Sequence, residues 1–184
     1  IALIWGNGDA EERKKAVVKF FIYTIAGSLF MLAAFAYLFT KTHNFLLVDF
    51  AMVNLTINEQ FWIFLAFFLA YAIKIPLIPF HSWQANVYQK SPTVGTMLLS
   101  GIMLKMGTFG VIKWLLPIVP LGLEKWGGTA IVLSAVGIVY ASIIAIEQKD
   151  FKRLIAFSSI AHVGLISAGI LSCNQQGIQG AVMQ

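Results

Sequence analysis

Two lysines and two histidines are the residues of this sequence best able to carry a proton through apolar surroundings. Lys74 and Lys105 each lie near the middle of a long apolar run, and His81 and His162 lie in or beside such runs. A lysine at the centre of a bilayer costs about 2.5–3.5 kcal/mol on insertion scales, so it normally faces protein or water and pairs with an acid. All eight acidic residues lie in links or at segment ends. We therefore expect water, another subunit or chain outside this sequence to supply the partner.

The stretch AYAIKIPLIPFHSW, residues 70–83, places two helix breakers beside Lys74. Pro76 and Pro79 each lack a backbone N–H and clash with the carbonyl four residues earlier, so the apolar helix should break here. Broken helices with a charge at the break form ion sites in transporters. A proline kink used only for packing is the alternative, but the combination with His81 favours a site.

His162 lies in the segment FSSIAHVGLIS, where Ser158 and Ser159 recur with it at helical spacing. Imidazole exchanges a proton near neutral pH, so this polar stripe is a candidate proton relay. Small polar residues also join membrane helices by hydrogen bonds, so helix packing remains an equal alternative.

Gly101 and Lys113 carry two further expectations about the Lys105 helix. Gly101 lies one turn before Lys105, so a neighbouring backbone is expected to approach the ammonium there; ordinary helix packing is the alternative. Lys113 lies beside Trp114 near a helix end, where its long side chain should reach the headgroups.

The composition indicates a membrane protein. The 184 residues are 59% hydrophobic and 11% charged, with a mean hydropathy of +0.81, whereas a soluble domain is about 25% charged. The net charge of +5 does not predict nucleic-acid binding, because the basic residues cluster in links between apolar runs. The single cysteine, Cys173, excludes an internal disulfide, and no cofactor or metal motif is present.

Five segments reach the length of about 20 mostly apolar residues that a spanning helix needs. They cover residues 16–39, 60–88, 94–116, 127–148 and 153–173. Residues 1–6 and 176–184 have the character of partial helices, so the chain is expected to be an internal piece of a longer protein. The predicted fold is an all-α polytopic membrane protein with a single transmembrane domain over 1–184 and one helix broken at Pro76 and Pro79.

The basic residues in the links divide unequally between the two sides of the membrane. Eight lie on one side: Arg13, Lys14, Lys15, Lys19, Lys90, Lys149, Lys152 and Arg153. Three lie on the other: Lys41, Lys113 and Lys125. The positive-inside rule predicts that the first side faces the cytoplasm or its equivalent.

Several motifs resemble one family of membrane proteins. KIPLIPFHSW followed by SPTVGTMLLSGIMLKMGTFG is similar to the pattern K-x-P-x-x-P-x-H-x-W … A-P-T-x-G-S … L-A-G-x-L-L-K-x-G-x-Y-G. That pattern belongs to the antiporter-like membrane subunits of respiratory complex I, the NADH–quinone oxidoreductase, a family that includes cation/proton antiporters and membrane-bound hydrogenases. The stretches at 19–32 (KFFIYTIAGSLFML) and 150–166 (DFKRLIAFSSIAHVGLI) also fit, and the first points to the chain M (mitochondrial chain 4) branch.

The resemblance implies part of an inverted-repeat antiporter-like fold and a role for each candidate residue. By residue match, Lys74 takes the place of the broken-helix lysine, Lys105 that of the lysine on the following helix, and His162 that of the histidine between the half-channels. A glutamate upstream of residue 1 would pair with Lys74, and a further glutamate would lie beyond Gln184.

The implied partners are the lipid bilayer, the other membrane subunits of complex I and the rest of the same chain, with no nucleic acid. FMN, iron–sulfur clusters and quinone would belong to other subunits, and none to this chain. The implied location is the bacterial inner membrane, with the mitochondrial inner membrane as the alternative.

The sequence departs from the family pattern directly after Trp83. The family usually has Leu-Pro-Asp-Ala at this point, whereas this chain has Gln84-Ala85-Asn86-Val87. We expect the change to lie in a cytoplasmic-side link, where it would affect loop contacts and proton entry rather than the core site.

The predicted function is a non-redox, proton-translocating subunit of NADH–quinone oxidoreductase. Lys74, Lys105, His162 and water would form the relay, with His81 as a further candidate, and Pro76, Pro79 and Gly101 would shape the site. The alternative is a subunit of an Mrp-type Na⁺/H⁺ antiporter or of a membrane-bound hydrogenase. The third candidate is a passive scaffold, which would leave two intramembrane lysines unexplained.

Overall fold

The structure is a computed structural model that describes residues 9–184, and every element in that part of the chain is helical. The partial helix expected over 1–6 lies outside the described residues. The elements are α1 (Ala10–Thr42), α2 (Leu47–Met52), α3 (Ile57–Lys74), α4 (Ser82–Lys90), α5 (Thr93–Leu98), η2 (Leu99–Met103), α6 (Leu104–Gly110), η3 (Val111–Leu115), α7 (Leu116–Ile118), α8 (Pro120–Glu147), α9 (Phe151–Leu171) and α10 (Gln175–Met183). The predicted all-α fold is confirmed.

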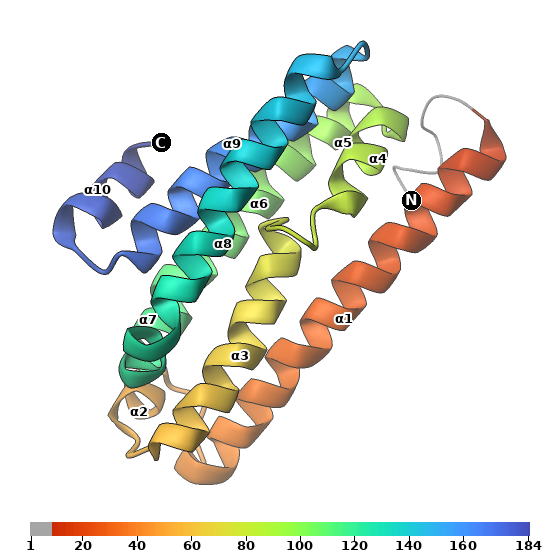
Figure 1. Ribbon diagram of the computed structural model, residues 1–184. Coiled ribbons are helices and arrows are strands. Elements are labelled where there is room, and N and C mark those ends of the chain that lie inside the picture. The colour runs from red at the N-terminus through yellow and green to blue at the C-terminus, as the bar shows by residue number, and fades with distance from the viewer. Residues whose placement is uncertain (1–8) are drawn as a thin grey trace.

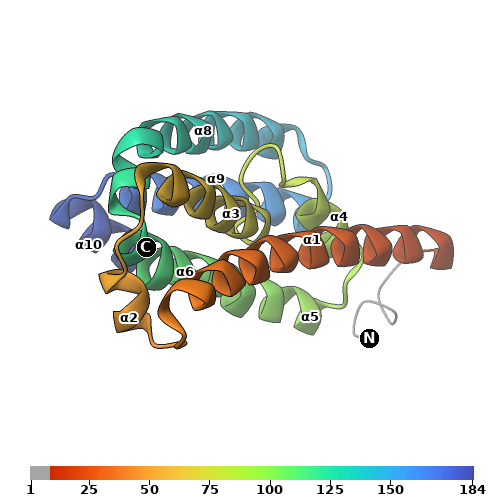
Figure 2. The same ribbon diagram turned by 90° about the horizontal axis from the view of Figure 1, so that it is seen from below.

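Helix α3 is the centre of the bundle. It packs between α1 on one side and α8 on the other, with α6 and η3 along a third side (Figures 1 and 2). Its side chains Phe67, Ala70 and Ala72 are completely buried. By contrast, α1 exposes large apolar side chains such as Phe21 and Leu32, as a helix in lipid does.

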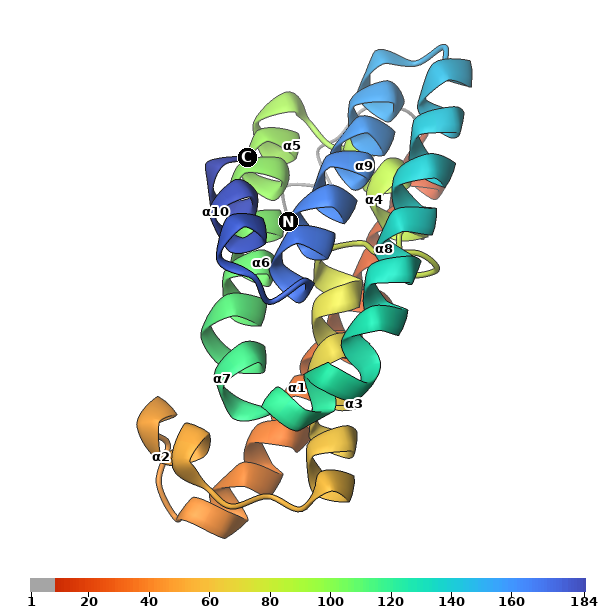
Figure 3. The ribbon, with the colours of Figure 1, turned by 60° about the vertical axis from the view of Figure 1, so that its left-hand side comes forward.

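Four helical runs among the described residues are long and apolar enough to cross a membrane. These are Ala10–Thr42, Thr93–Ile118, Pro120–Glu147 and Phe151–Leu171. The fifth segment expected from the sequence, residues 60–88, is divided between α3 and α4, which follow each other with a break between them (Figure 3). The break falls where the two prolines predicted it.

The backbone groups released at the break find new partners. Helix α3 ends at Lys74, two residues before Pro76, and the Leu77 N–H donates to the carbonyl of Ala72 over 2.9 Å. The indole N–H of Trp83, which is completely buried, donates to the carbonyl of Ile73 over 3.0 Å. The first turn of α4 is thereby tied to the last turn of α3, as satisfaction of backbone groups in hydrocarbon requires.

The departure from the family pattern lies in a helix, so the expectation of a link was wrong. Residues 84–87 belong to α4, and the side chains of Gln84, Ala85 and Val87 are buried. Ala85 lies in the first turn of α4, where a proline is also tolerated, so the helix does not depend on this difference from the family pattern. The change therefore alters the packed interior.

The two groups of basic residues lie at opposite ends of the bundle. The start of α1, the end of α4 and the α8–α9 turn share one end (Figure 1). There Lys90 pairs with Glu12, and the Lys152 ammonium donates to the carbonyl of Ser91 over 2.8 Å. Lys41 pairs with Glu59 over 2.8 Å at the other end. These contacts hold the links against the helix ends.

Asp150 begins α9 by capping its first turn. Its carboxylate accepts the backbone N–H groups of Lys152 and Arg153 over 2.8 and 3.2 Å. The hydrogen bond from the Arg153 N–H is the main reason that the pKa of the Asp150 carboxyl lies below its usual range. The cap is therefore present above that usual range and weakens as the pH falls through the lowered pKa.

We predict that Trp83→Phe destabilises the protein by about 1–3 kcal/mol, because it keeps the aromatic bulk but leaves the Ile73 carbonyl without its donor at membrane depth. Thermal unfolding in detergent micelles measures the loss. Trp62→Phe is the matched control, since Trp62 is 65% exposed. Equal stability of the two variants would contradict the assigned role of the indole.

Candidate functional site

Lys74 lies at the end of α3 in a closely packed position. It is partly buried, and the next three residues of the break are buried. A Cβ atom added at Gly107 of α6 would lie 2.6 Å from Ile75 Cγ1 and 3.5 Å from Lys74 Cβ. Glycine at this position therefore lets α6 approach the broken helix directly beside Lys74.

A second close approach occurs at Gly110, where an added Cβ would lie 2.3 Å from the ring of Tyr71. Gly101 makes no such contact, because no described atom outside its own helical surroundings comes within 4 Å of an added Cβ, and the residue is exposed. The expectation that Gly101 admits a neighbouring backbone was therefore wrong for the described chain. Gly107 and Gly110 instead admit neighbouring side chains, those of Ile75 and Tyr71.

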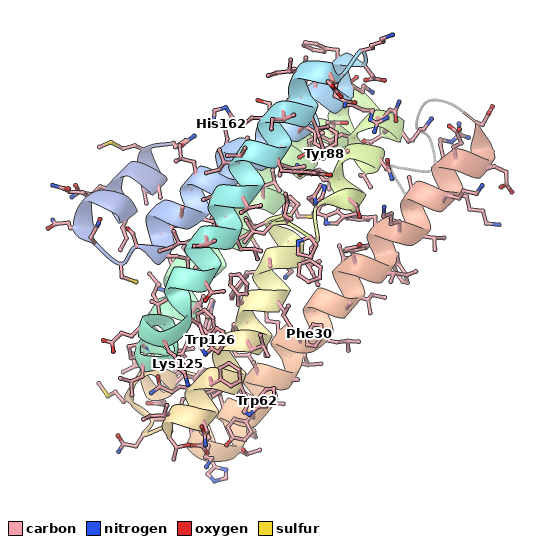
Figure 4. The ribbon with its side chains drawn as sticks, viewed as in Figure 1. Phe30, Trp62, Tyr88, Lys125, Trp126 and His162 are labelled. Atoms are coloured by element: carbon pink, nitrogen blue, oxygen red, sulfur yellow. The ribbon has the colours of Figure 1, made fainter. Side chains whose placement is uncertain are left out.

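Lys105 and His162 line the same groove, between the Lys105 helix and α9. The groove has a volume of about 300 Å³, and the hydroxyl side chains of Ser100, Ser158 and Ser159 also line it. The His162 ring projects from α9 toward the C-terminal end of α10 (Figure 4), and its Nδ1 lies 2.8 Å from Gln184 Nε2. An amine, an imidazole, hydroxyls and an amide thus share one partly open space.

Lys74 lies outside this groove. Residues of an α-helix advance by about 100° each, so Lys105 and Gly107 lie about 200° apart around α6. Gly107 contacts the broken helix, and Lys105 therefore projects to the other side of α6, where it is exposed. The two lysines lie on adjacent helices but do not face each other.

Ion pairs among the described residues leave both intramembrane lysines unpaired. The pairs found are Lys15–Glu11, Lys41–Glu59 and Lys90–Glu12, all near helix ends. Over residues 9–184, neither Lys74 nor Lys105 lies within salt-bridge distance of a carboxylate.

His81 lies in the break, on the side of α1 and α8. Its ring centroid is 5.2 Å from that of Tyr140, with an edge-on geometry. The neighbouring Ser82 hydroxyl lies 3.2 Å from the hydroxyl of Tyr23 on α1. The structure thus brings Lys105 and His162 together, but places His81 outside their groove.

Several features of the site were not anticipated from the sequence. Lys105 lies in a short α-helical segment between two π-helical segments, η2 and η3; such segments are frequent at functional sites. The paired small residues Ser100 and Gly101 within η2 are a sequence signal for irregular helix geometry. No motif in the sequence indicated that the side chain of Gln184, the last residue, would contact His162.

No group of three or more histidine, cysteine or carboxylate side chains that could hold a metal ion occurs within residues 9–184. The polar groups of the groove are amine, imidazole, hydroxyl and amide, and this set exchanges and relays protons more readily than it binds a metal.

Comparisons with known proteins identify relatives over nearly the whole chain. Residues 1–184 match the family described as NADH:quinone oxidoreductase/Mrp antiporter, TM. NADH-quinone oxidoreductase subunit M of Rickettsia prowazekii is 41% identical over 98% of this chain and 37% of the relative. NADH-ubiquinone oxidoreductase chain 4 of Chondrus crispus is 37% identical over 98% of this chain and 36% of the relative. The chain thus spans little more than a third of the length of these relatives.

Solved structures show the same fold. A chain of respiratory complex I from Thermus thermophilus matches with a TM-score of 0.88 and 32% identity, covering 98% of this chain and 39% of that one. A chain of the Mrp complex from Dietzia matches with a TM-score of 0.85 over 99% of this chain and 20% of that one; its 19% identity supports the fold alone.

The bacterial origin of relatives in Rickettsia and Rhodobacter is consistent with a multi-pass protein of the bacterial inner membrane. The family match covers all the motifs on which the resemblance rested. The chain belongs to the NADH:quinone oxidoreductase/Mrp antiporter transmembrane family, as those motifs predicted.

Proposed function

We propose that the chain is part of a proton-translocating subunit of NADH:quinone oxidoreductase and that Lys74, Lys105 and His162 carry protons through it. The observation that carries the proposal is the groove shared by Lys105 and His162 and lined with three serines. A titratable amine and an imidazole beside hydroxyl groups can pass protons through hydrogen-bonded water.

Lys74 acts in this proposal as the switchable site. An acidic side chain on a neighbouring helix, outside the described residues, holds the amine in its charged form. Movement of that acid away leaves the amine without a carboxylate partner beside the buried residues Ile75, Pro76 and Leu77, and the proton can then leave. The released proton then passes toward Lys105 and His162. Gly107 contributes by keeping the Lys105 helix close to the break.

The energy for this step comes from other subunits. We propose that FMN, iron–sulfur clusters and quinone belong to those subunits and that the chain itself carries out no redox chemistry. Its partners are the bilayer, the neighbouring membrane subunits and the rest of its own chain. His81 is a candidate for a further proton carrier, on the side of the break that faces Tyr140.

An Mrp-type Na⁺/H⁺ antiporter subunit is the second candidate, because the family description names both kinds of protein and the Mrp chain shares the fold. A membrane-bound hydrogenase subunit is a variant of the same candidate. Transport that requires Na⁺ in proteoliposomes would favour the antiporter. The identity of 37–41% to subunit M and chain 4 proteins favours the proton-pumping complex.

We predict that Lys74→Ala abolishes proton pumping by the assembled complex in sealed vesicles, with a fall of at least about tenfold, because one essential proton-transfer group is lost. Electron transfer to an artificial acceptor should persist at equal complex content. Lys113→Ala, in the same bundle but at an exposed position, is the matched control and should pump normally.

Lys74→Arg separates a switch from a fixed charge. Arginine keeps the positive charge but does not release its proton, so the variant should remain inactive. Normal pumping by either Lys74 variant would instead support the passive scaffold, the third candidate.

The role of His162 is tested by His162→Gln beside His162→Leu. A relay predicts that both variants pump severalfold more slowly, because neither side chain titrates. Helix packing predicts that glutamine, which retains hydrogen bonding, preserves pumping while leucine does not. Pumping per assembled complex is the readout, and His43→Gln in the exposed α1–α2 link is the control.

A further inference from the structure

His162 lies at the boundary of two grooves. The first is the groove that it shares with Lys105, and the second lies between α8 and α9 and has a volume of about 380 Å³. Ser158 lines both grooves together with His162, whereas Gln184, at the end of α10, lines the first groove only. The orientation of the imidazole ring therefore decides which ring nitrogen faces each groove.

The close packing of α10 on α9 brings Gln184 to His162. An added Cβ atom at Gly177 of α10 would lie 2.6 Å from the Gly169 carbonyl oxygen of α9, so the two helix backbones are in contact there. Only a short link joins the two helices, which run antiparallel. Gln184 follows Gly177 by seven residues and His162 precedes Gly169 by seven, so the same helix faces meet again two turns further on.

Gln184 is the hydrogen-bond partner found for the His162 ring within residues 9–184. Its Nε2 atom lies 2.8 Å from Nδ1 of the imidazole. An amide nitrogen donates but does not accept, so Nδ1 accepts in this arrangement and the proton of the neutral ring lies on Nε2. When the ring holds two protons, both nitrogens donate, and a half-turn of the amide presents its oxygen to Nδ1. Glutamine can therefore partner the ring in both of its protonation states.

No other group that faces His162 takes the place of this amide. Lys105 is the charged side chain that lines the shared groove, and its ammonium cannot accept a hydrogen bond. Ser142 of α8 lines the second groove, and α9 itself contributes Ser158 and Ser159. In the part of the chain that the structure describes, the imidazole makes no hydrogen bond to any of these groups. The orientation of the ring thus depends on a single amide.

We propose that Gln184 is a positioning residue for His162: its amide orients the imidazole and fixes which ring nitrogen carries the proton of the neutral form. Nε2 then carries that proton and is left free of the amide. The importance of this pairing for transport rests on the proposed function of His162 as a proton carrier, whereas the pairing itself does not.

The first test is a high-resolution electron cryo-microscopy map of the complete assembled complex, with and without Gln184→Leu. The expected result is a side-chain amide of Gln184 within about 3.2 Å of Nδ1 of His162, and a changed ring orientation in the variant. The proposal is overturned if the amide lies beyond hydrogen-bond distance of the ring, or if the ring keeps its orientation in Gln184→Leu.

The second test measures proton pumping in sealed vesicles as a function of pH, at equal complex content. Gln184→Leu should slow pumping severalfold, because the ring loses its partner. Gln184→Glu keeps the shape but carries a charge and only accepts, so it should change the pH dependence of pumping; it also replaces Gln184→Leu if that variant does not assemble. Wild-type pumping at every pH in the Gln184 variants would contradict the proposal.

Gln179 offers a matched control for both substitutions. It is an exposed residue of α10 and lies five residues before Gln184, roughly 140° away around the helix. Gln179→Leu and Gln179→Glu should therefore leave the rate and the pH dependence of pumping unchanged. Effects equal to those at Gln184 would assign the loss to α10 as a whole and overturn the positioning role.

A double-mutant cycle separates positioning from packing. A residue that acts through His162 has nothing to position in His162→Gln, so Gln184→Leu should cause no further loss of pumping in that background. The same severalfold loss in both backgrounds would show that Gln184 acts independently of the ring and would overturn the proposal.

These variants keep the inference distinct from the proposed function. If His162→Leu slows pumping but the Gln184 variants match the wild type, the positioning role is overturned and the relay is not. If Lys74→Ala and His162→Leu both pump normally, the proposed function fails, and the map alone decides whether Gln184 orients the ring.

Discussion

The hydrogen bond from the Trp83 indole to the carbonyl of Ile73 is the contact on which the centre of the molecule depends. Hydrocarbon offers no water to a free carbonyl, so a helix can be interrupted at membrane depth only if protein groups replace the missing donors. Pro76 and Pro79 remove donors from the chain, and Trp83 returns one from a side chain. The buried tryptophan also holds α4 in line with α3, and this fixes where Lys74, His81 and Gln84 lie.

Two glycines determine how the next helix meets the break. Gly107 and Gly110 leave room for the side chain of Ile75 and for the ring of Tyr71, which pack directly against the backbone of α6. The same contact turns Lys105 away from Lys74 and toward α9. The two glycines, which lack a Cβ atom, therefore determine both the close packing of α6 and the direction in which Lys105 projects.

The sequence predicted the helical fold and the position of the break. It did not predict how each helix is rotated against its neighbours. Proline chemistry is local, so the position of the break beside Lys74 followed from the residues alone. The face that a residue presents depends on how its helix is rotated against its neighbours, and spacing within one helix does not give that rotation. Gly101 was therefore chosen in place of Gly107, and the groove of Lys105 and His162 became visible only in three dimensions. The burial of Gln84 was missed because the family comparison placed it in a link.

The two π-helical segments lie on either side of Lys105, so the direction of its side chain depends on their geometry. A π turn holds about one residue more than an α turn, so conversion of one such turn to α geometry shifts the hydrogen-bond register by one residue. All residues beyond that point then rotate by about 100° around the axis. The segments η2 and η3 are five residues long each, and they flank Lys105 on its N-terminal and C-terminal sides. A rotation of that size is about half of the angle that separates Lys105 from Gly107 around α6.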